Sequence, residues 1–151
     1  MIMVPVLIMQ IFIFPFTATV IMNTWMDSRR TLELQETAGN LGSSIQQLYY
    51  TINQGAISNG TMRITLDLPP LLEGLAYTTT LHHVTHSDTS YEIMNVTLRT
   101  LGTNDQASTI VTLGQNVDWK ENSAFNSTSQ SLSIIANKTL NSIWISFGGG
   151  P

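Results

Sequence analysis

The first 26 residues of the chain contain no charged side chain. Apart from a few Thr, Asn and Gln residues they are mostly large aliphatic and aromatic residues, Met and Pro. About 20 consecutive apolar residues are enough for a helix to cross a bilayer, and this stretch is longer than that. A soluble domain of ordinary design has no use for such a segment. The chain must therefore bury it in lipid or against copies of itself.

Beyond residue 26 the helical pattern continues in an amphipathic form. Apolar residues recur at steps of three and four, which places them on one face of a helix, and polar residues occupy the other faces. No turn signal separates the two parts, and Gly55 offers a C-terminal stop. We therefore expect one helix from about residue 2 to residue 54, roughly 80 Å long at 1.5 Å per residue. The apolar stripe consists of Leu34, Ala38, Leu41, Ile45, Leu48 and Ile52.

Several residues modify this helix. Pro15 lies in its interior, where it removes a backbone hydrogen bond and is expected to kink the helix. Gly39 and Gly42 lower the helix propensity but permit the close approach of another backbone. Trp25 ends the apolar stretch, a position typical of residues at a membrane–water interface.

After Gly55 the period of the pattern changes from 3.6 to 2 residues. Short alternating runs separated by Gly, Pro and Asn turn signals predict about six or seven strands, and hence an antiparallel β-sandwich of the Ig-like kind. The expected fold class is α+β, with a helical part over residues 1–57 and a β part over residues 58–151. The expected strands are residues 62–68, 77–84, 91–98, 108–113, 117–120, 131–136 and 140–147, with a hairpin turn at 137–139 and a flexible or edge-lying Gly-rich tail from residue 148.

Charge and cysteine content exclude several classes of function. The net charge is −4, only 11% of residues are charged, and the six basic residues are scattered, which excludes a broad basic surface for nucleic acid. The chain has no cysteine, so neither a disulfide framework nor a thiolate site is available.

His82, His83 and His86 form the most suggestive group of chemically active side chains. On a helix the first and third would share a face and could bind zinc, but the Thr-rich alternation around them predicts a strand and a turn. Calcium at loop oxygens such as Asp88 or Asp105 is an unspecific alternative without an EF-hand spacing. No nucleophile elbow, phosphate loop or dinucleotide fingerprint occurs. We predict no catalytic residue, no metal and no cofactor, and an anchored exported hydrolase is the weakest hypothesis.

Four Asn-x-Thr sequons favour an exported surface that carries N-linked glycans. The alternative is that they are ordinary Asn-rich turns. The candidate glycosylation sites are Asn59, Asn95, Asn126 and Asn137.

The charges that flank the apolar stretch raise a question of orientation. No Lys or Arg precedes Arg29, so the basic region of a secretory signal peptide is missing. The positive-inside rule would place Arg29 and Arg30 in the cytoplasm, which conflicts with a glycosylated exterior. The conflict disappears if a short basic leader has been removed before Met1, and we expect such processing.

The whole pattern resembles archaeal type IV pilins and related archaeal surface-filament subunits. It combines a continuous apolar helix, an amphipathic extension and a Thr/Asn-rich β domain. Residues 3–8, Met-Val-Pro-Val-Leu-Ile, are similar to the proline-valine start of many mature archaeal pilins. Residues 64–77 are similar to a strand–proline–glycine–strand–tyrosine stretch that recurs after the helix in such proteins. Pro5 stands where bacterial pilins have a glutamate, so the resemblance is to the archaeal kind.

The resemblance implies a leader removed by a prepilin peptidase, storage in the cytoplasmic membrane, and an extracellular filament whose core is made of helices, with adhesion or surface contact as its role. The alternative is a membrane-anchored surface protein whose β domain binds an S-layer or surface glycans, like the stator components of archaeal motility machines. The residues expected in the filament core are Val4, Leu7, Ile8, Ile11, Phe12, Phe14, Phe16, Ile21, Trp25, Leu34, Ala38, Leu41, Ile45 and Leu48.

Overall fold

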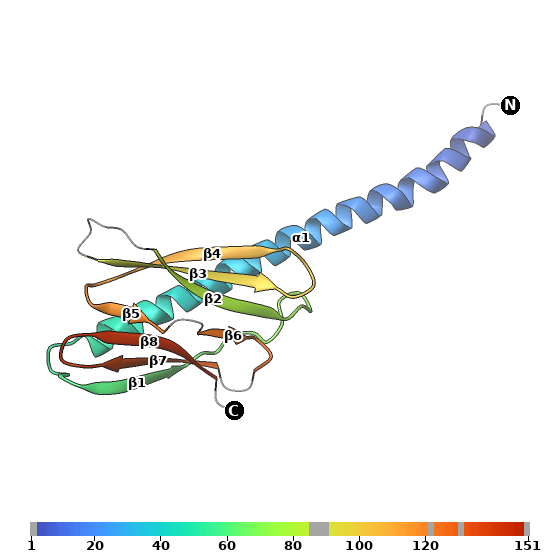
Figure 1. Cartoon of the computed structure of the whole chain (residues 1–151). Coiled ribbons are helices and arrows are strands. Elements are labelled where there is room, and N and C mark those ends of the chain that lie inside the picture. Colours follow the sequence, from blue (N-terminus) through green and yellow to red (C-terminus); the bar gives the residue numbers. More distant parts are fainter. Residues whose placement is uncertain (1–2, 85–90, 121–122, 130–131, 150–151) are drawn as a thin grey trace.

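The computed structural model describes residues 3–84, 91–120, 123–129 and 132–149. Within these ranges a single continuous helix, α1 (Met3–Ile52), precedes eight strands. Figure 1 shows α1 projecting far out of a head formed by the strands. The strands are β1 (Gly60–Thr65), β2 (Tyr77–Val84), β3 (Glu92–Thr100), β4 (Gln106–Leu113), β5 (Val117–Trp119), β6 (Ala124–Asn126), β7 (Leu132–Lys138) and β8 (Ile143–Gly149).

The strands form two four-stranded sheets, in the orders β1-β7-β8-β5 and β4-β3-β2-β6. Neighbouring strands are antiparallel except for β5 and β8, which are parallel. The chain is therefore an α+β protein with a β-sandwich, as the alternating pattern predicts. Strand β6 lies between the strands expected at 117–120 and 131–136, where none was predicted. Its three residues are too few to show a period.

The C-terminal half of α1 is part of the core of the head. Its apolar stripe packs against β4 and β3 of one sheet and against β1 and β7 of the other, so the helix lies along one side of the sandwich (Figure 1). One hydrophobic cluster contains the stripe and the inward-facing residues of both sheets. The boundary at residue 57 thus marks a change of secondary structure, whereas the packed unit already includes the helix from Leu34 onward.

This packing changes the assignment of five residues that we expected to take part in self-association. A sequence pattern shows that a helix has an apolar face but does not show what covers it. Here the chain's own strands cover it, so the side chains of the stripe are not exposed on the surface of the head. The five residues, each 0% exposed, are Leu34, Ala38, Leu41, Ile45 and Leu48.

The two glycines of this half differ in their surroundings. A Cβ atom on Gly42 would lie 2.9 Å from Thr109 Cγ2 and 3.1 Å from Val111 Cγ2, so Gly42 permits the helix to approach β4 closely. A Cβ atom on Gly39 would meet nothing within 4 Å. The expected close approach therefore occurs at Gly42, within the same chain, and not at Gly39.

The two ends of the head are also fixed by specific contacts. Helix α1 ends at Ile52, whose carbonyl oxygen accepts a hydrogen bond from Lys138 Nζ at 3.1 Å. At the other end Gly148 and Gly149 belong to β8. They pair with β7, beyond the part of β8 that pairs with β5, so the expectation of an edge-lying segment is confirmed for these two residues and that of a flexible tail is not. A Cβ atom on Gly148 would lie only 2.7 Å from both Ile135 Cδ1 and Ser133 Oγ, so a larger residue there would have to displace these two side chains.

Candidate functional site: the exposed helix and its junction with the head

The N-terminal half of α1 exposes apolar side chains on all of its sides. Their exposed fractions range from 37% for Met26 to 76% for Phe14. Most residues between 7 and 26 are apolar. Each is rotated by about 100° from the last, so the few polar residues do not form a continuous polar face. A helix of this kind is normally buried in protein or in a membrane. The exposed residues are Leu7, Ile8, Met9, Ile11, Phe12, Ile13, Phe14, Phe16, Val20, Ile21, Met22, Trp25 and Met26.

These residues include most of the predicted filament-core set. The side chain of Val4 lies outside the described part of the chain. By length and composition α1 is able to cross a membrane, and it is the one such helix in the described ranges. Residues 7–26 alone extend about 30 Å at 1.5 Å per residue, the thickness of the hydrocarbon core of a bilayer.

The hydroxyl groups of this segment are already satisfied within the helix. Thr17, Thr19 and Thr24 each donate to the carbonyl oxygen four residues earlier, at 2.9, 2.8 and 2.9 Å. Such bonds remove the cost of placing a hydroxyl in an apolar environment. The amides of Gln10 and Asn23, by contrast, make no hydrogen bond within the described residues.

Pro15 does not interrupt the helix. Figure 1 shows a gentle curve through the projecting half and no sharp break, so the bend is milder than the kink expected from the sequence. The hydroxyl of Thr19 donates to the Pro15 carbonyl at 2.8 Å, so this hydroxyl is satisfied within the helix.

Where α1 enters the head, Arg30 connects the helix to the loop before β4. Its Nη1 atom lies 2.9 Å from Asp105 Oδ2 and 3.3 Å from Asp27 Oδ1, and its side chain is only 12% exposed. The hydrogen bond from Arg30, with a second from Thr103, holds the pKa of Asp105 below its usual value. Sequence reasoning missed this pair because its partners are 75 residues apart.

Arg29 makes a second, more exposed connection. Its Nε atom lies 3.3 Å from Glu73 Oε1, and Nη2 lies 3.9 Å from Glu33 Oε1. Its guanidinium carbon lies 5.0 Å from the ring centroid of Trp25. Glu73 has a positive φ of 43°, an uncommon conformation for a residue other than glycine, in the turn between Leu72 and Leu75. Both arginines therefore have a structural reason to stand at this end of the apolar segment.

The loop that carries Glu73 is itself anchored in the head. The hydroxyl of Tyr77, at the start of β2, donates to the Pro69 carbonyl at 2.8 Å, and burial raises the pKa of this tyrosine to about 12. Ser127 Oγ donates to the Pro70 carbonyl at 2.7 Å and accepts from the Tyr77 backbone N–H at 3.0 Å. The loop is thus a fixed support for the junction.

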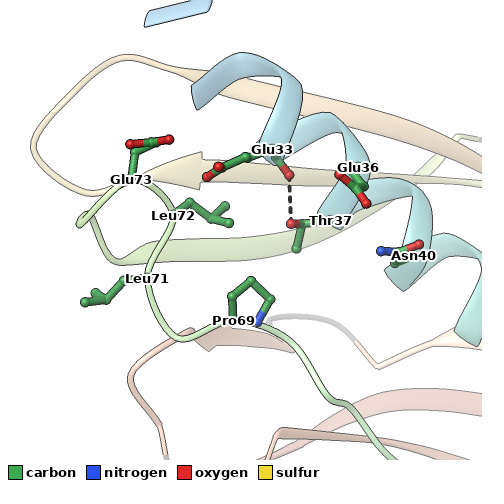
Figure 2. A pocket seen from close by; sticks show the side chains of 8 residues that line it. All are labelled: Glu33, Glu36, Thr37, Asn40, Pro69, Leu71, Leu72 and Glu73. Carbon is green, nitrogen blue, oxygen red and sulfur yellow. Dashed lines mark hydrogen bonds between the residues drawn. The ribbon is translucent and has the colours of Figure 1, made fainter. Parts of the chain in front are cut away.

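A groove of about 510 Å³ lies between α1 and this loop. Figure 2 shows the residues that line it. Three carboxylates line it, from Glu33, Glu36 and Glu73, and Thr37 Oγ1 donates to the Glu33 carbonyl at 2.7 Å. Two of these carboxylates are engaged by Arg29. Among the described residues, no group of three or more His, Cys, Asp or Glu side chains could hold a metal ion. We therefore assign no ligand to this groove.

The structure does not bring the histidines of the group together in the part of the chain that it describes. His82 and His83 are consecutive residues of β2, paired with Asn95 and Met94 of β3, and so they point to opposite faces of the sheet. His83 Nε2 is bonded to the carboxylate of Glu92. His86 and Asp88 lie outside the described residues, and the other candidate calcium ligand, Asp105, is bound to Arg30.

The four sequons differ in accessibility. Asn59 and Asn137 are exposed, whereas Asn95 and Asn126 are half-buried. The Oδ1 atom of Asn126 accepts from the backbone N–H and the hydroxyl of Thr128, at 3.2 and 3.0 Å. The Oδ1 atom of Asn95 is buried without a partner.

No family model, curated protein or solved structure matches the chain. The features of the structure that bear on function are therefore the exposed helix and its junction with the head.

Proposed function

We propose that the chain is a structural subunit of an extracellular helical filament of the archaeal type IV pilus kind. The projecting halves of α1 pack together in the core, and the heads lie outside. Before assembly the same helix holds the subunit in the cytoplasmic membrane. The observation that carries this proposal is the rigid connection between the apolar segment and the head.

Three features make this connection rigid. Helix α1 is continuous from Met3 to Ile52, its C-terminal half lies in the core of the head, and the pairs Arg30–Asp105 and Arg29–Glu73 join its exit point to two loops. In a helical filament every head must take the same position relative to the core. A membrane anchor has no such requirement, because a flexible linker serves it equally well.

The energetics suit a subunit that moves from lipid into a polymer. Burying each large apolar side chain gains about 1.5 to 3 kcal/mol relative to water, so the exposed half of α1 is strongly driven out of water. Lipid and a core of packed helices are both apolar, and the preference between them depends on packing. A subunit can therefore be stored in the membrane and transferred to a filament without exposure of the segment to water.

The length of α1 does not by itself distinguish a filament from an anchor. Residues 34–52 are largely taken up by the head, and the apolar residues that remain match the thickness of a bilayer. This match supports the second candidate function, a membrane-anchored surface protein whose β domain binds an S-layer or surface glycans. The side-chain amides of Gln10 and Asn23, by contrast, favour the filament. They would be costly in lipid, whereas between packed helices they can form hydrogen bonds.

A flexible insertion discriminates between the two functions. An insertion of four residues, Gly-Ser-Gly-Ser, between Asn23 and Thr24 separates most of the apolar segment from the head. It leaves the residues of the Arg29 and Arg30 ion pairs unchanged. We expect electron microscopy of sheared surface material to show filaments for the natural chain and none for this variant, while membrane fractionation finds the same amount of subunit.

The matched control is the same insertion beside Asn141, in the turn between β7 and β8, which should leave filaments intact. Filaments from the variant with the flexible segment would contradict the proposal, as would a natural chain found only as monomers or on vesicles. Deletion of residues 1–26 adds a second test, because an anchored binder should still bind its partner and a filament subunit should not assemble.

A further inference from the structure

An exposed tryptophan lies directly opposite one of the sequons. Trp144 of β8 pairs with Asn137 of β7, and its residue surface is 46% exposed. Directly opposed residues of an antiparallel pair point to the same face, with Cβ atoms about 4.5 to 5.5 Å apart. The Asn137 amide and the indole ring are therefore neighbours on the outer face of the sheet β1-β7-β8-β5.

The orientation of this tryptophan is fixed by the β7–β8 turn. Its Nε1 atom donates to Ser142 Oγ at 3.1 Å, and the same hydroxyl is 3.0 Å from Thr139 Oγ1. Thr139 is the third residue of the sequon, and its backbone N–H also bonds to the Ser142 carbonyl at 2.9 Å. The turn thus holds a large aromatic surface in solvent next to the amide.

The surroundings suit a carbohydrate. Asn137 and Trp144 line a shallow groove of about 400 Å³ with Ile135, Ser146 and Lys120. The C–H face of a sugar ring packs well on an aromatic or aliphatic surface, which the indole and Ile135 provide. Sugar hydroxyls need hydrogen-bond partners, which the Ser146 hydroxyl and the Lys120 ammonium group can supply.

The other sequons lack this combination of features. Asn95 and Asn126 are half-buried, and the Asn126 amide oxygen is occupied by Thr128. Asn59 is exposed in the segment between α1 and β1. It provides a comparison site that is accessible but lies outside the groove of Trp144.

We propose that Asn137 is N-glycosylated and that its first sugar packs on the indole of Trp144. The proposal rests on the extracellular location in the proposed function. The co-reactant is a lipid-linked oligosaccharide, delivered by the transferase of the cell. A bond forms between Asn137 Nδ2 and C1 of the sugar, the bond from C1 to the phosphate oxygen breaks, the amide nitrogen loses one proton, and the lipid phosphate leaves. No oxidation or reduction occurs.

Glycopeptide mass spectrometry of the full chain, isolated from glycosylating cells, tests the site first. We expect a glycan on Asn137. Denaturant unfolding in detergent then tests the contact in four chains: natural, Asn137→Gln, Trp144→Ala, and both changes together. Loss of the glycan should raise the unfolding equilibrium constant about 2- to 10-fold when Trp144 is present, and less than about twofold when it is absent.

Asn59→Gln is the matched control and should change the constant less than about twofold in both backgrounds. If Trp144→Ala fails to fold, Trp144→Phe keeps an aromatic ring and should show a smaller but measurable coupling. An unmodified Asn137 would overturn the site, and equal effects of Asn137→Gln with and without Trp144 would overturn the packing. Filament formation is scored separately by electron microscopy, so assembled filaments with an unmodified Asn137 would refute this inference alone.

Discussion

The two halves of α1 differ in what covers their apolar side chains. Between residues 34 and 52 apolar residues occupy one face, and strands of the same chain cover that face completely. Between residues 7 and 26 apolar residues occupy every face, and the chain covers none of them. An amphipathic half thus has its partner within the molecule, whereas an all-apolar half needs a partner outside it. Mutations in matched positions of the two halves can test this contrast.

Shortening a buried side chain of the C-terminal half should have the largest effect. Leu41→Ala leaves a cavity between the helix and the sheets, and we expect the free energy of unfolding to fall by about 2 to 5 kcal/mol. Phe12→Ala, at a residue that is 72% exposed, should change it by less than about 0.5 kcal/mol and instead weaken filaments. Denaturant titration in detergent, followed by tryptophan fluorescence, measures both. Equal losses would show that the two halves do not differ.

The two glycines give a smaller contrast with opposite signs. Gly42→Ala drives a methyl group against the stiff side chains of Thr109 and Val111, and we expect a loss of about 1 to 3 kcal/mol. Gly39→Ala meets open space and should gain about 0.5 to 1 kcal/mol from higher helix propensity. The same unfolding titration applies. A stabilising Gly42→Ala would mean that the helix can move away from β4 at little cost.

The junction should contribute less than the core. Arg30→Gln removes the bonds to Asp105 and Asp27, and we expect a loss of about 1 kcal/mol, while the more exposed Arg29→Gln should cost less than about 0.5 kcal/mol. Both variants should also yield filaments with more variable head positions, visible as weaker order in averaged images. Well-ordered filaments from the variant with both changes would show that the helix alone fixes the head.

The smallest expected effect is a dependence on pH. The folded-state pKa of Asp105 is lowered, chiefly by the hydrogen bond from Arg30. Its contribution to stability is therefore complete above the unfolded-state value of about 3.9 and is lost as the pH falls through the lower, folded-state value. Unfolding titrations from pH 6 down to about pH 2 should show this loss in the natural chain and a reduced one in Arg30→Gln. Identical profiles would exclude the pair as its source.

The periodic patterns of the sequence predict the helix stripe and strand β2 correctly. The stripe that begins at Leu34 and the alternation of residues 77–84 were both recognised, and the second coincides with β2, Tyr77–Val84. Burial of one face makes every third or fourth residue of a helix, or every second residue of a strand, apolar. Both stretches are long enough for this period to be visible.

What the sequence did not show are relationships between distant segments. The stripe packs against strands of both sheets, Arg30 pairs with Asp105, and β5 runs parallel to β8. None of these pairings can be recognised from a local stretch of sequence. The sequence also leaves two alternatives open at Gly148, since a glycine in an edge-lying strand and a glycine in a flexible tail look the same in sequence. The sequence predicts the apolar segment of the candidate site. It does not predict the junction that fixes the position of this segment relative to the head.

The helix stripe in the core of the head has a consequence for biosynthesis. Residues 34–52 are synthesised early, but the hydrophobic core that they share with β7 and β8 can form only after those strands, nearly a hundred residues later, have been synthesised. Such distant contacts make folding slow relative to helix formation. A fragment that begins at residue 58 would lack the stripe and expose the inner faces of both sheets. If the helix enters a membrane first, as the proposed function implies, the head is the last part to fold, and it folds around an element whose other end is already in lipid.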